Sequence, residues 1–123
     1  MLVLHFNEAD QILCIDNTGG ISFQNLAFES YRVIQEKKLP QNLKILEHAT
    51  AFLINSDVDR LKSLKDKLLE NTLHFDSVKH AIVTSDPAVT AYVMMVKLYL
   101  GNSNYTLEVF SNNEAANHWL LTG

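Results

Sequence analysis

The pattern of hydrophobic and polar positions changes its period along the chain, and these changes predict the order of elements. Five short runs have the apolar, β-branched composition of strands: 2–6, 11–15, 43–47, 81–83 and 105–110. Four stretches repeat apolar side chains at helical spacing: 22–38, 57–70, 88–100 and 115–120. A further apolar run, 50–54, precedes the second of these helices. The sequence therefore predicts two strands, then helix, strand, helix, strand, helix, strand and helix.

The polar segment 7–10 between the first two strands has the length of a hairpin connection. We therefore expect the sheet to begin with an antiparallel pair. The regular alternation of helix and strand that follows is typical of parallel strands with helices packed on them. The predicted fold class is α/β, with a mostly parallel sheet opened by an antiparallel hairpin and with four helices. A chain of 123 residues suits one core, so we expect a single domain over residues 1–123.

The segment 79–100 organises this arrangement, because a buried strand turns directly into an unusually apolar helix. Ser85 or Asp86 can cap the helix, and Pro87 suits its first turn. The helix carries a single charge, Lys97. One sheet buries only part of the circumference of a helix, so the remaining apolar face needs another cover. We expect a subunit interface or a ligand pocket to be formed by Ala91, Met94, Met95 and Leu98.

Composition and charge narrow the class of protein. Hydrophobic residues make up 47% of the chain and charged residues 20%, as in soluble globular proteins. The formal charge of −4 argues against nucleic acid or an anionic membrane as the main partner. The single cysteine, Cys14, permits no internal disulfide and is interpreted as a buried structural thiol in a reducing compartment. The start of the chain lacks signal-peptide features, and no apolar stretch reaches the ~20 residues that span a bilayer, so we expect a cytoplasmic protein without membrane insertion.

No set of residues forms a strong catalytic, cofactor-binding or metal-binding motif. Gly19 and Gly20 stand without the longer glycine pattern and the lysine of a phosphate loop. The histidines have no identifiable serine or cysteine partner, and no pair has the His-x-x-x-His spacing of a metal site. Asp16 and Asp86 are isolated, whereas a phosphoacceptor receiver domain needs an acidic cluster for Mg²⁺. The sequence therefore predicts a protein that is not an enzyme, without catalytic residues, cofactor or metal.

Two segments carry a family resemblance. The order of elements, the segment 79–87 (KHAIVTSDP) and above all 109–120 (VFSNNEAANHWL) resemble the SpoIIAA-like proteins of the STAS class, whose small bacterial members are largely of unassigned function. The resemblance implies a STAS-like fold for nearly the whole chain. Relatives in the class include anti-sigma-factor antagonists, which are phosphorylated on a loop serine before a helix, and lipid-binding proteins. By this analogy Ser56 is the candidate phosphosite; the loop lacks the second serine and the glycine of the family pattern, and Ser56 is also a plausible helix cap with Asp59.

These observations lead to one working hypothesis and one alternative. The hypothesis is a non-enzymatic, cytoplasmic binding or regulatory module that forms a homodimer or binds another protein. The alternative is a carrier or sensor of a small apolar, lipid-like ligand, because flexible methionine and aromatic side chains can line an adaptable pocket. Trp119 is expected to be a buried anchor of the last helix, which a capping box of Ser111 and Glu114 would begin.

Overall fold

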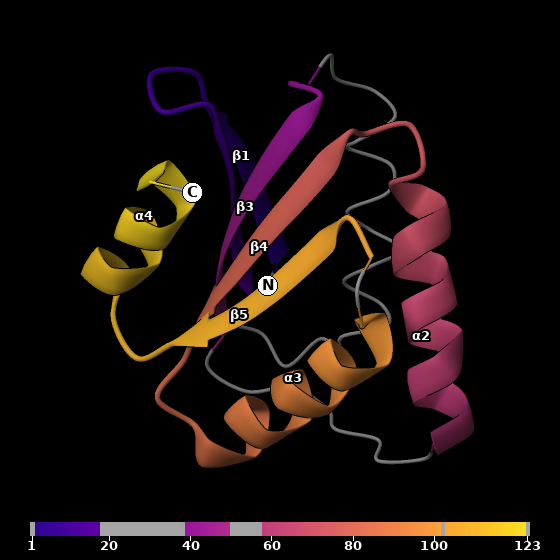
Figure 1. Cartoon of the computed structure of the whole chain (residues 1–123). Helices are drawn as coiled ribbons and strands as arrows, with labels where there is room; N and C mark the ends of the chain where they lie inside the picture. Colours follow the sequence, from indigo (N-terminus) through magenta and orange to yellow (C-terminus); the bar gives the residue numbers. More distant parts are fainter. Residues whose placement is uncertain (1, 18–38, 50–57, 102, 123) are drawn as a thin grey trace.

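The computed structural model describes residues 2–17, 39–49, 58–101 and 103–122 (Figure 1). The strands are β1 Leu2–Asn7, β2 Ile12–Asn17, β3 Asn42–Ala49, β4 Ser77–Val83 and β5 Tyr105–Phe110. The helices are α2 Val58–Asn71, α3 Pro87–Leu100 and α4 Asn113–Thr122. The predicted helix 22–38, the apolar run 50–54 and Ser56 lie outside the described residues. Three of the four predicted helices are therefore confirmed, and the helix 22–38 stays a prediction.

The five strands form one mixed sheet in the order β1-β2-β3-β4-β5. β1 pairs with β2 in an antiparallel hairpin, and each later strand pairs with its predecessor in parallel. The hairpin turn is held by Asn7, whose side-chain oxygen accepts hydrogen bonds from the backbone N–H groups of Ala9 and Asp10 at 3.0 and 3.3 Å. The predicted α/β class, with a mostly parallel sheet opened by an antiparallel hairpin, is confirmed.

Two hydrophobic clusters lie on opposite faces of the sheet. Successive side chains of a strand point to opposite faces, so β2, β3, β4 and β5 each contribute to both clusters, whereas β1 contributes only to the larger one. The larger cluster joins the sheet to α2 and α3, through residues such as Leu43, Val78 and Val93. The smaller cluster joins it to α4, with Leu46, Ala81 and Leu120 among its members. Figure 1 shows the resulting layers, with α4 beside one face of the sheet and with α2 and α3 on the other.

The structure corrects two element boundaries. β4 begins at Ser77 rather than at residue 81, because its first half alternates buried and half-buried side chains, which a search for a continuous apolar run does not find. α4 is capped by Asn112 rather than by the predicted box of Ser111 and Glu114. The side-chain oxygen of Asn112 accepts the backbone N–H of Ala115 at 2.8 Å, which is the usual capping contact one turn into a helix.

Candidate functional site

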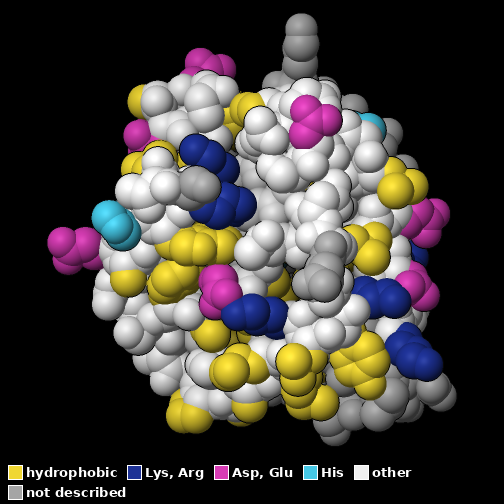
Figure 2. Space-filling model, in the orientation of Figure 1, with side chains coloured by type: hydrophobic (Ala, Val, Ile, Leu, Met, Phe, Trp, Pro, Cys, Tyr) yellow, Lys and Arg dark blue, Asp and Glu magenta, His cyan; other side chains and the backbone are white. Residues whose placement is uncertain are grey.

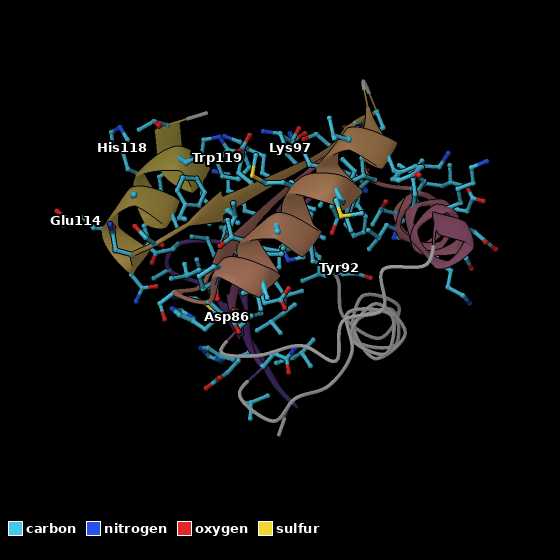
Figure 3. The ribbon with its side chains drawn as sticks, turned by 90° about the horizontal axis from the view of Figure 1, so that it is seen from below. Asp86, Tyr92, Lys97, Glu114, His118 and Trp119 are labelled. Carbon is cyan, nitrogen blue, oxygen red and sulfur yellow. The ribbon has the colours of Figure 1, made fainter. Side chains whose placement is uncertain are left out.

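The exposed face of α3 is an apolar stripe, here called the α3 stripe and formed by Ala91, Met94, Met95 and Leu98. Local signals fix the position of the helix. The Asp86 carboxylate accepts the backbone N–H of Ala88 at 2.9 Å, Pro87 occupies the first turn, and Gly101 ends the helix with φ of 58°. Figure 3 shows Asp86 at the N-terminal end of α3 and Tyr92 and Lys97 further along the helix.

One side of α3 is buried against the sheet and α2, and the stripe is on the other side. The buried side consists of Val89, Tyr92, Val93, Val96 and Leu100. Opposite it, the exposed fractions are 54% for Met94, 37% for Met95 and 81% for Leu98, and Ala91 is exposed as well. Large hydrophobic side chains are normally exposed singly, so a run of them over two helical turns is a feature that needs a reason.

The α3 stripe carries no charge of its own. The only charged residue of α3, Lys97, forms an ion pair with Glu108 of β5 in the same chain. In Figure 2, hydrophobic side chains follow the lower edge of the molecule, where Figure 1 places α3, and a pair of opposite charges lies above them. A second apolar surface can therefore approach the stripe without removing an unpaired charge from water.

A shallow surface pocket lies at the C-terminal end of α3. Its lining residues are Lys97, Leu100, Gly101, Tyr105, Thr106 and Leu107. No residue of the α3 stripe lines this pocket, since the stripe faces outward. The stripe therefore does not form the wall of this pocket.

A buried polar network crosses the centre of the sheet. The Nε2 atom of His80 lies 2.8 Å from a carboxylate oxygen of Glu47, and its Nδ1 atom lies 2.6 Å from the hydroxyl of Tyr105. The three side chains come from β3, β4 and β5 and point into the larger hydrophobic cluster, as the alternation of their strands requires. His80 is paired in register with Ile45 and Leu107, so the network runs diagonally across the three strands.

The electrostatics of this network favour the neutral form of Tyr105. Burial raises the pKa of Tyr105 far above its ordinary value, and the nearby Glu47 carboxylate adds to the effect. The Tyr105 hydroxyl therefore keeps its hydrogen. In the tautomer of His80 that carries its N–H on Nε2, the ring donates to Glu47 and Nδ1 accepts the hydrogen of Tyr105. The second carboxylate oxygen of Glu47 has no hydrogen-bond partner among the described residues.

An acid, a histidine and a hydroxyl in series resemble a catalytic triad in connectivity, but burial separates this one from any substrate. The exposed fractions of Glu47, His80 and Tyr105 are 0%, 4% and 3%. A raised pKa also makes the Tyr105 hydroxyl a worse nucleophile, where catalysis needs the opposite shift. The network therefore acts inside the fold, by tying three neighbouring strands together.

Sequence reasoning missed this network. Glu47 and His80 were placed in or beside strands, and Tyr105 began a predicted strand, but nothing in their spacing indicated contact. The only available signal was the odd or even position of each residue in its strand, which decides the face of the sheet to which its side chain points. The position within a strand predicts which side chains meet only when the strand order and register are known.

The other candidate side chains are dispersed. His5, His74 and His118 are exposed, and His48 contacts the side-chain oxygen of Asn113. Within the described ranges, no three histidine, cysteine, aspartate or glutamate side chains are grouped so that they could hold a metal ion. Cys14 is half-buried rather than buried as predicted, because its side chain packs at the margin of the smaller cluster. Burial, and to a smaller extent Asp10, raise the pKa of the Cys14 thiol, which lowers its reactivity.

Trp119 does not occupy the fully buried position expected for it. The buried residues of α4 are Ala116 and Leu120. Trp119 is half-buried, and the centre of its ring lies 5.6 Å from the centre of the Phe110 ring. Figure 3 shows Trp119 on the sheet side of α4 and Glu114 and His118 directed away from it. The position of Trp119 next to the buried Leu120 suits this partly covered location, where its ring packs against the smaller cluster.

No protein-family model, no curated protein and no solved structure matches this chain. The resemblance to SpoIIAA-like proteins therefore stays an expectation. In the part of the chain that the structure describes, no helix is both long and apolar enough to cross a membrane.

Proposed function

We propose that this protein is a non-enzymatic, cytoplasmic binding or regulatory module of the STAS type that works as a homodimer, with the α3 stripe as its subunit interface. The observation that carries the proposal is the exposure of Met94 and Leu98 on a helix whose opposite side is buried. The single cysteine and the burial of the Glu47, His80 and Tyr105 network support the cytoplasmic and non-enzymatic parts of the proposal.

The spacing of the α3 stripe suits a second copy of the same stripe. In an antiparallel two-fold pair centred between Met94 and Met95, the small Ala91 faces Leu98 of the partner subunit, and the reverse contact follows by symmetry. A small side chain opposite a large one fills the interface evenly, and the two methionines adapt their shape at the axis. Because Lys97 is paired with Glu108, the contact brings no two free like charges together.

The decisive measurement is the molar mass in solution, by light scattering or sedimentation over a range of concentrations. We expect the unmodified protein to be a dimer and the double variant Met94→Glu, Leu98→Lys to be a folded monomer, because opposite charges in one stripe must be desolvated on dimerisation. The matched control is Leu121→Lys on α4, whose side chain is 52% exposed and lies away from the stripe. This control should remain a dimer.

Two results would reject the dimer. One is a monomeric unmodified protein at high micromolar concentration, which would mean that the stripe is not a subunit interface. The other is a monomer that carries a co-purified apolar molecule in native mass spectrometry, which would favour the carrier or sensor function instead. A dimer that survives the double variant would place the interface on a different surface.

A further inference from the structure

The face of the sheet that carries α4 is mainly apolar at one end, where it also holds His48 and Glu108, and polar at the other end. α4 covers the half formed by residues such as Leu46, Ala81 and Phe110. The other half, towards the N-terminal ends of the parallel strands, is not apolar. By the alternation of β3, β4 and β5, its side chains are Asn42, Lys44, Ser77, Lys79 and Thr106, all of them half-buried or exposed.

Two lysines stand side by side at the centre of this polar half. Lys44 and Lys79 are direct partners in the register of β3 and β4, so their Cα atoms are separated by one strand spacing, about 4.8 Å. Neither ammonium group forms an ion pair with a carboxylate of the described residues. Like charges that face each other on neighbouring strands destabilise a sheet, so this lysine pair lowers the stability of the fold.

Lys79 is held in place by α4. Its ammonium group donates a hydrogen bond of 2.8 Å to the backbone oxygen of Trp119 and lies 4.6 Å from the centre of the Trp119 ring. Burial lowers the pKa of Lys79, and the charge of Lys44 lowers it further. A bound anion would oppose both effects, because it stabilises the protonated form of Lys79.

The shape and charge of the surroundings favour one kind of anion. The lysines lie on the face of the sheet that carries α4, among side chains that are half-buried or exposed, so a carboxylate-rich strand or loop can approach them. The chain as a whole carries a charge of −4, which repels a long polyanion such as a nucleic acid or an anionic membrane more strongly than a short acidic segment that contacts only the two lysines. In Figure 2, neighbouring basic side chains lie beside the hydrophobic group in the region where Figure 1 places α4 and the sheet.

We infer that Lys44 and Lys79, together with the half-buried ring of Trp119, form a docking surface for an acidic peptide segment of a partner protein. Two adjacent carboxylates of such a segment match two adjacent ammonium groups, and Thr106 and Ser77 supply hydroxyl groups beside them. This surface lies on the opposite face of the sheet from the α3 stripe. It goes beyond the proposed homodimer, and the failure of one does not affect the other.

The test uses the full chain and a fluorescein-labelled hexaglutamate peptide, with binding measured by fluorescence anisotropy at low salt. Trp119 is the only tryptophan of the chain, so a change in its emission on adding unlabelled peptide reports contact at this surface. We expect saturable binding that weakens about fivefold in Lys44→Gln and in Lys79→Gln, and that is largely retained in the matching arginine variants. Higher salt should weaken binding as well.

The matched control is Lys62→Gln, which removes an exposed lysine of α2. Its peptide affinity should equal that of the unmodified protein, and circular dichroism should show all variants folded. Equal weakening by Lys62→Gln would mean non-specific attraction and would overturn the inference. Binding that inorganic phosphate abolishes at an equal concentration of charge, or tighter binding of a single-stranded oligonucleotide, would also overturn it, because the surface would then not be selective for an acidic peptide.

Discussion

The side chain that most needs an explanation is Glu47, a carboxylate with no exposed surface in the middle of a hydrophobic cluster. Burying a charged group costs several kcal/mol unless a partner compensates for it, and His80 supplies only one of the two oxygens with a hydrogen bond. The compensation depends on register, because a shift of one residue in β4 would turn His80 to the opposite face. The network therefore favours a single pairing of β3, β4 and β5 over its alternatives.

Tyr105 gives this network a measurable pH dependence. In the unfolded chain a tyrosine ionises near pH 10, whereas burial and Glu47 raise the pKa of Tyr105 in the folded protein. The folded state then holds a proton that the unfolded state loses, so the stabilisation is complete below about pH 10 and decreases at higher pH. We expect the free energy of unfolding to fall above pH 10 by up to about 1.4 kcal/mol per pH unit from this residue.

Tyr105→Phe isolates this effect. The variant should be about 1–3 kcal/mol less stable at pH 7, because the hydrogen bond to His80 is lost, and its stability should fall less steeply above pH 10. Urea unfolding between pH 7 and pH 11 measures both quantities. Parallel curves for the two proteins at alkaline pH would show that Tyr105 is not buried as described.

Among single residues, sequence reasoning succeeded where the contact is local. Asp86 was one of two candidates for the α3 cap, because a cap needs only a side chain two residues before the N–H that it accepts. It failed for Glu47 and Tyr105, whose contacts with His80 span 33 and 25 positions of the chain. It also overestimated the burial of Cys14 and Trp119, since an apolar side chain in an apolar run need not reach the cluster.

The assignment of Asp86 as the cap of α3 gives a prediction about this helix. Asp86→Ala should lower the free energy of unfolding by about 1 kcal/mol, because the backbone N–H of Ala88 loses its acceptor at the helix N-terminus. The neighbouring Ser85 is exposed, and Ser85→Ala should change stability by no more than a few tenths of a kcal/mol. Chemical denaturation of both variants decides the question. If Ser85→Ala is the more damaging substitution, the cap has been assigned to the wrong residue.

The helices and strands were predictable to the extent that one face of each is regularly apolar. α3 and the first hairpin follow from local patterns, and their bounds agree with the predictions to within about two residues, the usual uncertainty of element ends. The first half of β4 was missed because Lys79 and His80 read as polar, although the first packs on Trp119 and the second is buried with Glu47. A polar side chain that is stabilised by a distant partner can lie in a buried strand, and a prediction based on hydrophobic pattern then misses that strand.

The layered arrangement of the molecule was predictable in class but not in detail. Alternation of strands and helices indicated a parallel sheet after a hairpin, and the sheet has this form. The sequential strand order and the assignment of α4 to one face and of α2 and α3 to the other were not predicted, because they depend on how each connection crosses the sheet. The proposed dimer and the proposed acidic partner depend on this assignment, since it leaves the α3 stripe and the lysine pair on different faces.

The separation of the two hydrophobic clusters by the sheet leads to a final prediction. Leu100 of α3 and Leu120 of α4 are nearly equal in burial but belong to different clusters, so they share no packing neighbours in the clusters described. Leu100→Ala and Leu120→Ala should each cost about 2–5 kcal/mol. In the double variant the two losses should add to within about 0.5 kcal/mol, as for independent sites in one cooperative fold.

A second pair of substitutions tests whether the measurement can detect coupling at all. Val96 and Leu100 lie one turn apart on the buried side of α3, in the same cluster. Val96→Ala combined with Leu100→Ala should deviate from additivity by more than about 0.5 kcal/mol, because the two truncated side chains share a cavity. Urea unfolding monitored by both circular dichroism and Trp119 fluorescence gives the free energies. Strong coupling between Leu100 and Leu120, or a fluorescence transition that precedes the loss of helix signal, would contradict a sheet that separates two clusters within one cooperative unit.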